Sequence, residues 1–304
     1  MPDLSTKIGA LHLKNPVLVA SGTFGYGKES EGLVDFAGLG GIVTKSVSLK
    51  PRDGNPPPRI FEVPAGMLNS IGLANVGVET FLGEKLPFLR GLDTSIIVNV
   101  AGSTADEFVQ VVERLENEPG ISAYELNFSC PNVKEGGLAF SQEAAVTQEV
   151  TRRVKTVASR PLIVKLTPNV TRVSEIAQGA LDGGADAVSL INTLVGFAIN
   201  IKTRRPQIHT GTAGYSGPAI KPVALAKVYE VATHVQIPII GIGGISGPTD
   251  ALEFIIAGAT AVQIGTANFI NPATGTATVA GIEAYCREHD FHTIAEAVGS
   301  VQPW

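Results

Sequence analysis

Eight short, mainly apolar runs recur along the chain, separated by longer segments of mixed polarity. They cover residues 16–20, 41–45, 95–100, 123–127, 162–166, 187–191, 238–242 and 261–265. Strands of a parallel sheet are buried on both faces, so they read as nearly continuous apolar runs and not as an apolar–polar alternation. The pattern therefore predicts eight parallel strands.

Segments with helical periodicity lie between these runs. They cover residues 104–115, 141–158, 173–183, 221–234 and 248–258. Ser103 or Thr104 is a suitable N-cap for the first, because Glu107 follows Thr104 by three residues. Gly258 suits the end of the last. Alternating strands and helices predict a parallel sheet. Eight repeats predict one (β/α)₈ TIM barrel over residues 1–304, with a doubly wound sheet as the alternative.

Length and composition agree with one large barrel domain. The chain has 304 residues, of which 44% are hydrophobic and 17% charged. The net charge is −5 and basic residues cluster only at Arg204 and Arg205, which argues against a nucleic-acid partner. The N-terminus does not resemble a signal peptide, and no apolar run reaches the roughly 20 residues that span a bilayer. We expect a cytoplasmic protein that does not contact the membrane and holds no metal.

The predicted strands end in polar residues and glycines. These are Ser21, Lys45, Ser46, Asn99, Asn127, Lys165, Asn192, Thr193, Gly243, Gly244, Gly265 and Thr266. Active-site groups of barrels lie at the C-terminal ends of the strands. A buried lysine must be paired or must face a ligand anion, because an isolated buried charge is costly. The set predicts a binding site for a polar ligand.

The glycines after the seventh and eighth runs indicate what that ligand carries. Barrels often bind phosphate at this place, through backbone N–H groups that glycines allow to come close. Ser246 stands where a dinucleotide fingerprint would have its third glycine. We therefore expect a mononucleotide such as FMN, and no NAD site in this chain.

Two further features bear on the chemistry. The stretch 46–73 is long and rich in Pro and Gly, and a loop of that length is usually functional. Cys130, between Asn127 and Asn132, is a candidate nucleophile or base, although a free cysteine is also a common core filler. Asparagines bind the amide and carbonyl edges of rings such as pyrimidines. No histidine lies nearby to form a Cys–His pair, and we expect Cys286 to be structural.

A series of motifs runs along nearly the whole chain in a fixed order. They occupy residues 15–25, 44–47, 54–59, 67–73, 127–132, 191–194, 216–219 and 265–269. With them the chain resembles the class 1 dihydroorotate dehydrogenases, and within these the 1B catalytic subunit. The stretch 209–215 departs from the family pattern.

The resemblance implies oxidation of (S)-dihydroorotate to orotate in de novo pyrimidine (UMP) biosynthesis. Cys130 would be the base for the C5 proton, and the C6 hydride would go to N5 of FMN. Lys165 would lie near flavin N1 and O2, and Lys45 between flavin and substrate. The implied FMN contacts are Ser21, Lys45, Ser46, Asn99, Asn127, Lys165, Ile191, Gly217, Gly243, Gly244, Gly265 and Thr266. The implied substrate contacts are Lys45, Asn69, Ser70, Ile71, Gly72, Leu73, Asn127, Asn132, Asn192 and Thr193.

The resemblance also implies an electron-transfer partner subunit that carries FAD and a [2Fe–2S] cluster and passes electrons to NAD. The two cysteines of this chain are too few for such a cluster, which takes four thiolates. A homodimer core of a heterotetramer is implied as well. Three alternatives remain open: a fumarate-using 1A enzyme, a Schiff-base aldolase with Lys165 or Lys45 as nucleophile, and a flavin-bearing scaffold that docks a partner.

Overall fold

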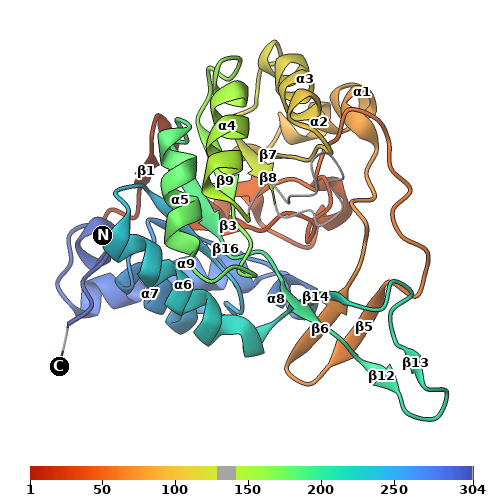
Figure 1. Ribbon diagram of the computed structural model, residues 1–304. Helices are drawn as coiled ribbons and strands as arrows, with labels where there is room; N and C mark the ends of the chain where they lie inside the picture. Colours follow the sequence, from red (N-terminus) through yellow and green to blue (C-terminus); the bar gives the residue numbers. More distant parts are fainter. Residues whose placement is uncertain (129–141, 303) are drawn as a thin grey trace.

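Eight parallel strands close into a barrel in the computed structural model, which describes residues 1–128, 142–302 and 304 (Figure 1). The order around the barrel is β3 (Val17–Val19), β4 (Gly41–Val43), β7 (Ser95–Val100), β8 (Ala123–Asn127), β9 (Leu162–Lys165), β10 (Ala187–Leu190), β15 (Ile239–Ile242) and β16 (Ala261–Ile264). Each lies within one of the eight predicted runs and differs from it by at most two residues in total. The predicted TIM barrel is confirmed.

Helices follow most of the strands and surround the barrel. They are α1 (Gly77–Thr80), α2 (Leu86–Leu89), α3 (Ala105–Glu116), α4 (Ala144–Lys155), α5 (Val173–Asp182), α6 (Lys221–His234), α7 (Pro248–Ile256), α8 (Ala267–Ile270) and α9 (Thr274–Glu288). Single turns complete the set: η1 (Lys28–Ser30), η2 (Phe36–Gly38), the π-helical η3 (Phe81–Lys85), η4 (Pro218–Ile220) and η5 (Ile294–Ala297). The five predicted helices correspond to α3 to α7. Thr104 caps α3 by accepting the Glu107 N–H, as expected.

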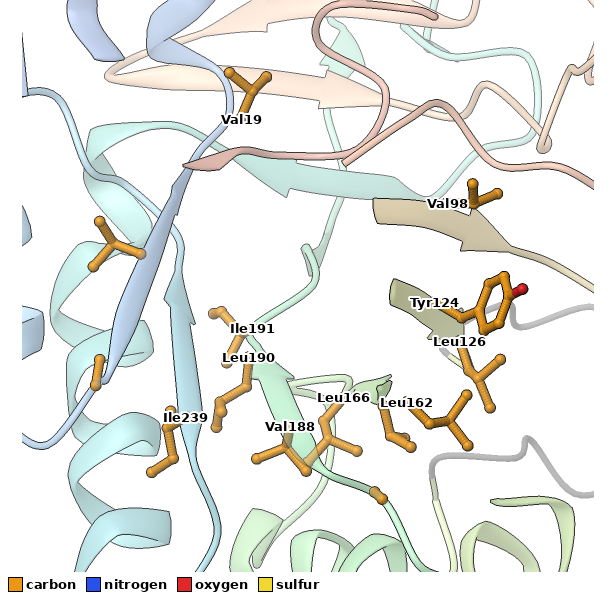
Figure 2. Packing of buried hydrophobic residues seen from close by; sticks show 14 of the residues in the cluster. Val19, Val98, Tyr124, Leu126, Leu162, Leu166, Val188, Leu190, Ile191 and Ile239 are labelled. Atoms are coloured by element: carbon orange, nitrogen blue, oxygen red, sulfur yellow. The ribbon is translucent and has the colours of Figure 1, made fainter. Parts of the chain in front are cut away.

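The strands are apolar on both faces because each face packs against a separate layer. Outward residues pack under the helices, and Figure 2 shows Leu162, Leu166 and Val188 in this layer. The inward layer takes one residue from every barrel strand: Leu18, Val43, Ile97, Ala123, Ile163, Ala187, Ile240 and Ala261. Burial of both faces explains why the strands appear in the sequence as continuous apolar runs.

An N-terminal hairpin closes one end of the barrel. It consists of β1 (Thr6–Ile8) and β2 (Leu11–Leu13), paired antiparallel. Its side chains Ile8, Leu11 and Leu13 belong to the inward apolar layer. This layer includes the first residues of β8, β10 and β16, so the hairpin plugs the N-terminal end of the barrel and leaves the C-terminal end for a site.

A second, antiparallel sheet extends from the C-terminal end of the barrel, at the lower right of Figure 1. Its order is β11 (Leu194–Gly196), β14 (Ala213–Ser216), β6 (Gly66–Asn69) and β5 (Ile60–Val63), and a small ribbon of β12 (Ile199–Asn200) and β13 (Arg205–Pro206) lies beyond it. The expectation of a loop throughout 46–73 was therefore wrong. The hairpin β5–β6 turns at Pro64-Ala65, with Ala65 at φ 54°, and so lacks the Asn-Gly or Asp-Gly signal of such turns.

Candidate active site

Toward the C-terminal ends of the strands, the next layer of inward-facing side chains in the barrel is polar instead of apolar. Successive inward side chains are two residues apart. The residues two positions after the apolar layer are polar and buried on five strands: Asn99, Glu125, Lys165, Ser189 and Gln263. This polar layer forms the floor beneath the strand ends.

Glu125 is the centre of this layer and is completely buried. Its Oε1 accepts a hydrogen bond from Asn99 Nδ2 at 2.7 Å and lies 3.5 Å from Lys165 Nζ. Its Oε2 accepts from Ser189 Oγ at 2.8 Å and from Gln263 Nε2 at 2.7 Å. The buried carboxylate therefore has four partners, which are three hydrogen-bond donors and one ammonium group. They take the place of the water that burial excludes.

A cavity of about 870 Å³ lies above this floor, at the C-terminal ends of the strands. Its size falls within the range of small-molecule and cofactor sites. The predicted site residues that line it are Ser21, Lys45, Ser46, Asn69, Ser70, Ile71, Gly72, Leu73, Asn127, Lys165, Ile191, Asn192, Thr193, Gly217, Gly243, Gly244, Gly265 and Thr266. Cys130 and Asn132 lie outside the described residues.

Asn99 was predicted to contact the ligand directly, and the structure places it elsewhere. It is completely buried inside β7, in register with Glu125 on β8, and is not among the lining residues. The prediction counted Asn99 among the strand-end residues, but both the predicted run and β7 extend to Val100, so Asn99 lies within the strand. Asn99 instead accepts a hydrogen bond from Ser46 Oγ at 2.5 Å, and Ser46 lines the cavity.

The charges that line the cavity are positive. Lys45, Lys165, Arg52 and Arg59 contribute to its wall, and none of the described lining residues is Asp or Glu. A cavity with one sign of charge and low-dielectric walls concentrates ligands of the opposite sign. The electrostatics favour an anionic ligand, such as a phosphate or a carboxylate.

Glycines form one end of the cavity. Gly243 and Gly244 have φ values of 124° and 75°, which side-chain-bearing residues rarely adopt. A Cβ on Gly265 would meet only Ala20 Cβ at 3.5 Å and Thr23 Cγ2 at 3.9 Å, so it would project into the space of the cavity. Backbone that is bare of side chains at the ends of strands seven and eight fits a phosphate group.

Another part of the wall comes from the antiparallel extension. Asn69 ends β6, and the neighbouring Ser70 Oγ accepts hydrogen bonds from Asn55 Nδ2 at 2.8 Å and from Thr210 Oγ1 at 2.9 Å. Thr210 belongs to the stretch 209–215, so this stretch supports the wall. Amide side chains from β6 and from the strand ends of the barrel therefore face one cavity.

The amides at the strand ends are themselves ordered. Asn192 Nδ2 lies 3.4 Å from Asn127 Oδ1, and Asn169 Nδ2 donates to the Thr193 carbonyl at 3.1 Å. Tyr26 donates to the Ser46 carbonyl at 3.2 Å, and burial raises the pKa of this tyrosine to about 12, so it remains a neutral donor. These bonds hold the donors and acceptors of the cavity wall in place before a ligand arrives.

Some residues of the site were missed in the sequence. Glu125, Ser189 and Gln263 lie inside short apolar strands. The one signal in the sequence was a polar or charged residue within a run expected to be buried, where its side chain cannot be solvated and needs a partner. Thr167 and Asn169 follow β9 and line the cavity. Cys286, expected to be structural, is buried in α9, and burial raises the pKa of its thiol.

The chain matches the dihydroorotate dehydrogenase family model over residues 3–285.

No helix in the described part of the chain combines the length and apolarity needed to cross a membrane.

Bacterial relatives match over the full length. The chain is 52% identical over 301 residues to the dihydroorotate dehydrogenase B (NAD⁺) catalytic subunit of Geotalea daltonii, with 99% of each chain covered. It is 51% identical over 301 residues to the subunit of the same name from Pelobacter propionicus, again with 99% of each covered. It is 51% identical over 300 residues to that of a Thermoanaerobacter species, at the same coverage. The chain therefore belongs to the dihydroorotate dehydrogenase family.

Proposed function

We propose that this chain is the catalytic subunit of an NAD⁺-linked type B dihydroorotate dehydrogenase, and that residues 1–304 act as one domain. It oxidises (S)-dihydroorotate to orotate in pyrimidine biosynthesis. The observation that carries the proposal is the cavity: all described residues of the predicted cofactor and substrate sets, Asn99 excepted, line it together. Full-length identity of about half to type B catalytic subunits supports the same assignment.

Family membership implies a flavin, and we propose FMN at the C-terminal face of the barrel. Gly217, Gly243, Gly244, Gly265 and Thr266 would hold its phosphate. Ser21, Ser46, Asn127 and Ile191 would contact its ring system. The bare Gly265 backbone and the cationic wall fit such a group. When bound, FMN supplies the hydride acceptor.

The side chains of the wall bind and orient the substrate. Asn69, Asn127, Asn192 and Thr193 would pair with the polar edges of the pyrimidine ring, together with the backbone of residues 70–73. Lys45 would balance the substrate carboxylate. Lys165, which lines the cavity, would provide a fixed cation where negative charge develops during the reaction.

Cys130 would remove the C5 proton of dihydroorotate. It follows Asn127 by three residues in the sequence, and Asn127 lines the cavity. A free thiol has a pKa of about 8.5, and nearby cations lower that value. Lys45 and Lys165 line the cavity, and a thiol placed beside them would be favoured as the thiolate.

Two electrons must leave the chain after each turnover. The relatives are named catalytic subunits, which implies a partner subunit. We propose that this partner carries FAD and a [2Fe–2S] cluster and delivers the electrons to NAD⁺. A homodimer of this chain would form the core of the complex. The two cysteines here are too few to hold the cluster.

The test is to purify the chain alone, identify any flavin that heat releases, and assay dihydroorotate oxidation with an artificial acceptor, with fumarate and with NAD⁺. The proposal predicts FMN and turnover with the artificial acceptor, but not with NAD⁺ in the absence of the partner. Flavin without turnover would indicate a scaffold, and turnover with fumarate a 1A enzyme. A colourless protein that borohydride traps with a carbonyl substrate would indicate a Schiff-base enzyme.

A further inference from the structure

We infer that Glu125 is a positioning residue that fixes Lys165 at the cavity floor and sets the charge that a bound flavin experiences. This inference rests on the proposed flavin site. Glu125 touches no part of the cavity itself, since it is completely buried and is not among the lining residues. It acts through its neighbours.

The charge state of Glu125 follows from its contacts. Both of its oxygens accept hydrogen bonds from side-chain N–H or O–H groups: Asn99 to Oε1, and Ser189 and Gln263 to Oε2. The fourth contact is the ammonium group of Lys165. An ionised carboxylate is an acceptor only, and the two amide N–H groups, the Ser189 hydroxyl and the ammonium group can all donate to it, which matches the charged form.

Two branches, each a chain of side-chain contacts, connect the Glu125 carboxylate to residues that line the cavity. The direct branch is Lys165, whose side chain is 7% exposed and whose Nζ lies 3.5 Å from Oε1. The second branch passes through Asn99, which donates to Glu125 at 2.7 Å and accepts from Ser46 Oγ at 2.5 Å. Both Lys165 and Ser46 line the cavity. One buried anion therefore determines where a cation and a hydroxyl sit at its floor.

The electrostatic consequence has a definite sign. The Glu125 charge, one contact below Lys165, partly cancels the positive field that Lys165 exerts on the cavity. Reduction adds negative charge to a flavin. Loss of the Glu125 charge would leave Lys165 uncompensated and would favour the reduced form.

The measurement is the midpoint potential of the bound flavin, determined at equilibrium with a reference dye, in wild type and in Glu125→Gln. The variant keeps the shape of the side chain and removes its charge. We expect the ratio of reduced to oxidised flavin at a fixed potential to rise at least tenfold, which for a two-electron couple is a positive shift of about 30 mV. An unchanged potential in a folded, flavin-bound variant would overturn the inference.

Two further variants separate the effect of the Glu125 charge from the effect of its hydrogen bonds. They also test whether Glu125 acts through Lys165. Ser189→Ala removes one neutral donor from Glu125 and should change the ratio by less than twofold; a change as large as that of Glu125→Gln would contradict the charge account. In a Lys165→Met background, Glu125→Gln should shift the potential by less than it does in the wild type, because only the direct field of the carboxylate remains to be removed. A full additive shift there would show that Glu125 does not act through Lys165.

Glu125→Asp covers the case in which Glu125→Gln does not fold. It keeps the charge but withdraws it from Lys165 by one methylene, so the potential should shift in the same direction by a smaller amount, and no shift would overturn the inference. Failure of the proposed function is seen separately, as a wild-type protein that binds no flavin or whose flavin dihydroorotate does not reduce.

Discussion

Lys165 Nζ lies 3.5 Å from Glu125 Oε1, and the two side chains are 7% and 0% exposed. They come from adjacent strands, β9 and β8, whose register pairs Lys165 with Asn127 and Glu125 with Ile163. A charge on either residue alone would be costly in the barrel interior, and pairing offsets part of that cost. The barrel can therefore present a cation at the floor of its cavity without an isolated charge in its core.

Lys165→Met should destabilise the protein, because it leaves Glu125 buried without its cation. Removal of one partner of a buried pair typically costs about 3–5 kcal/mol. The free energy of unfolding, measured by urea titration, should fall by an amount in this range.

The double variant Lys165→Met/Glu125→Gln is the matched control, since it removes both charges. It should be more stable than Lys165→Met alone. Equal stability of the single and double variants would mean that the pair is not the source of the loss.

Gly265→Ala should weaken FMN binding while leaving the fold unaffected. Its Cβ would enter the cavity and meet only Ala20 and Thr23 at ordinary contact distances. Overfilling a packed space costs roughly 1–3 kcal/mol, so the FMN dissociation constant should rise about tenfold. Quenching of FMN fluorescence on titration with apoprotein measures it.

Gly247→Ala serves as the comparison. Gly247 has an extended backbone, with φ 172°, and a Cβ there would have open space around it. It does not line the cavity, so its FMN affinity should equal that of the wild type. Equal affinities for both variants would argue against a phosphate site at Gly265.

Glu116→Gln should reduce stability at neutral pH. Burial raises the pKa of Glu116, but hydrogen bonds from Ser159 and Arg160 outweigh it and lower the pKa below the ordinary 4.5. A lowered folded-state pKa stabilises the fold above the ordinary value, and this contribution is lost as pH falls through the folded value. The variant should lose about 1–3 kcal/mol at neutral pH.

The difference between wild type and Glu116→Gln should shrink as the pH falls below 4.5, as followed by urea unfolding at several pH values. Glu113→Gln, an exposed position on the same helix, should behave like the wild type throughout. A difference that stays constant with pH would show that ionisation of Glu116 does not contribute.

The barrel could be predicted from the sequence because both faces of each strand are buried. Ile163 in the inner layer and Leu162 in the outer layer are consecutive residues, so the strand appears as a continuous apolar run. The residues at the strand ends were also predictable, because chain direction alone brings Lys45, Asn127 and Lys165 to one end of a parallel barrel.

The parts that could not be predicted depend on distant partners. β6 pairs with β5 locally, but its other edge pairs with β14, and Ser216 is the partner of Met67. No pattern in the sequence around β6 or β14 indicates that these two strands pair. Glu125 was missed for the same reason: its partners Asn99, Ser189 and Gln263 come from three other strands, and only closure of the barrel brings them together.

The most direct test of the central claim is anaerobic rapid mixing of the flavin-bound chain with dihydroorotate, in wild type and in Cys130→Ser. The account predicts that the oxidised flavin bands bleach in the wild type. In Cys130→Ser the rate should fall by about 10²–10⁴, as expected for loss of a general base. Bleaching at the wild-type rate in Cys130→Ser would contradict Cys130 as the base, and a wild-type flavin that dihydroorotate cannot reduce would contradict the proposed function.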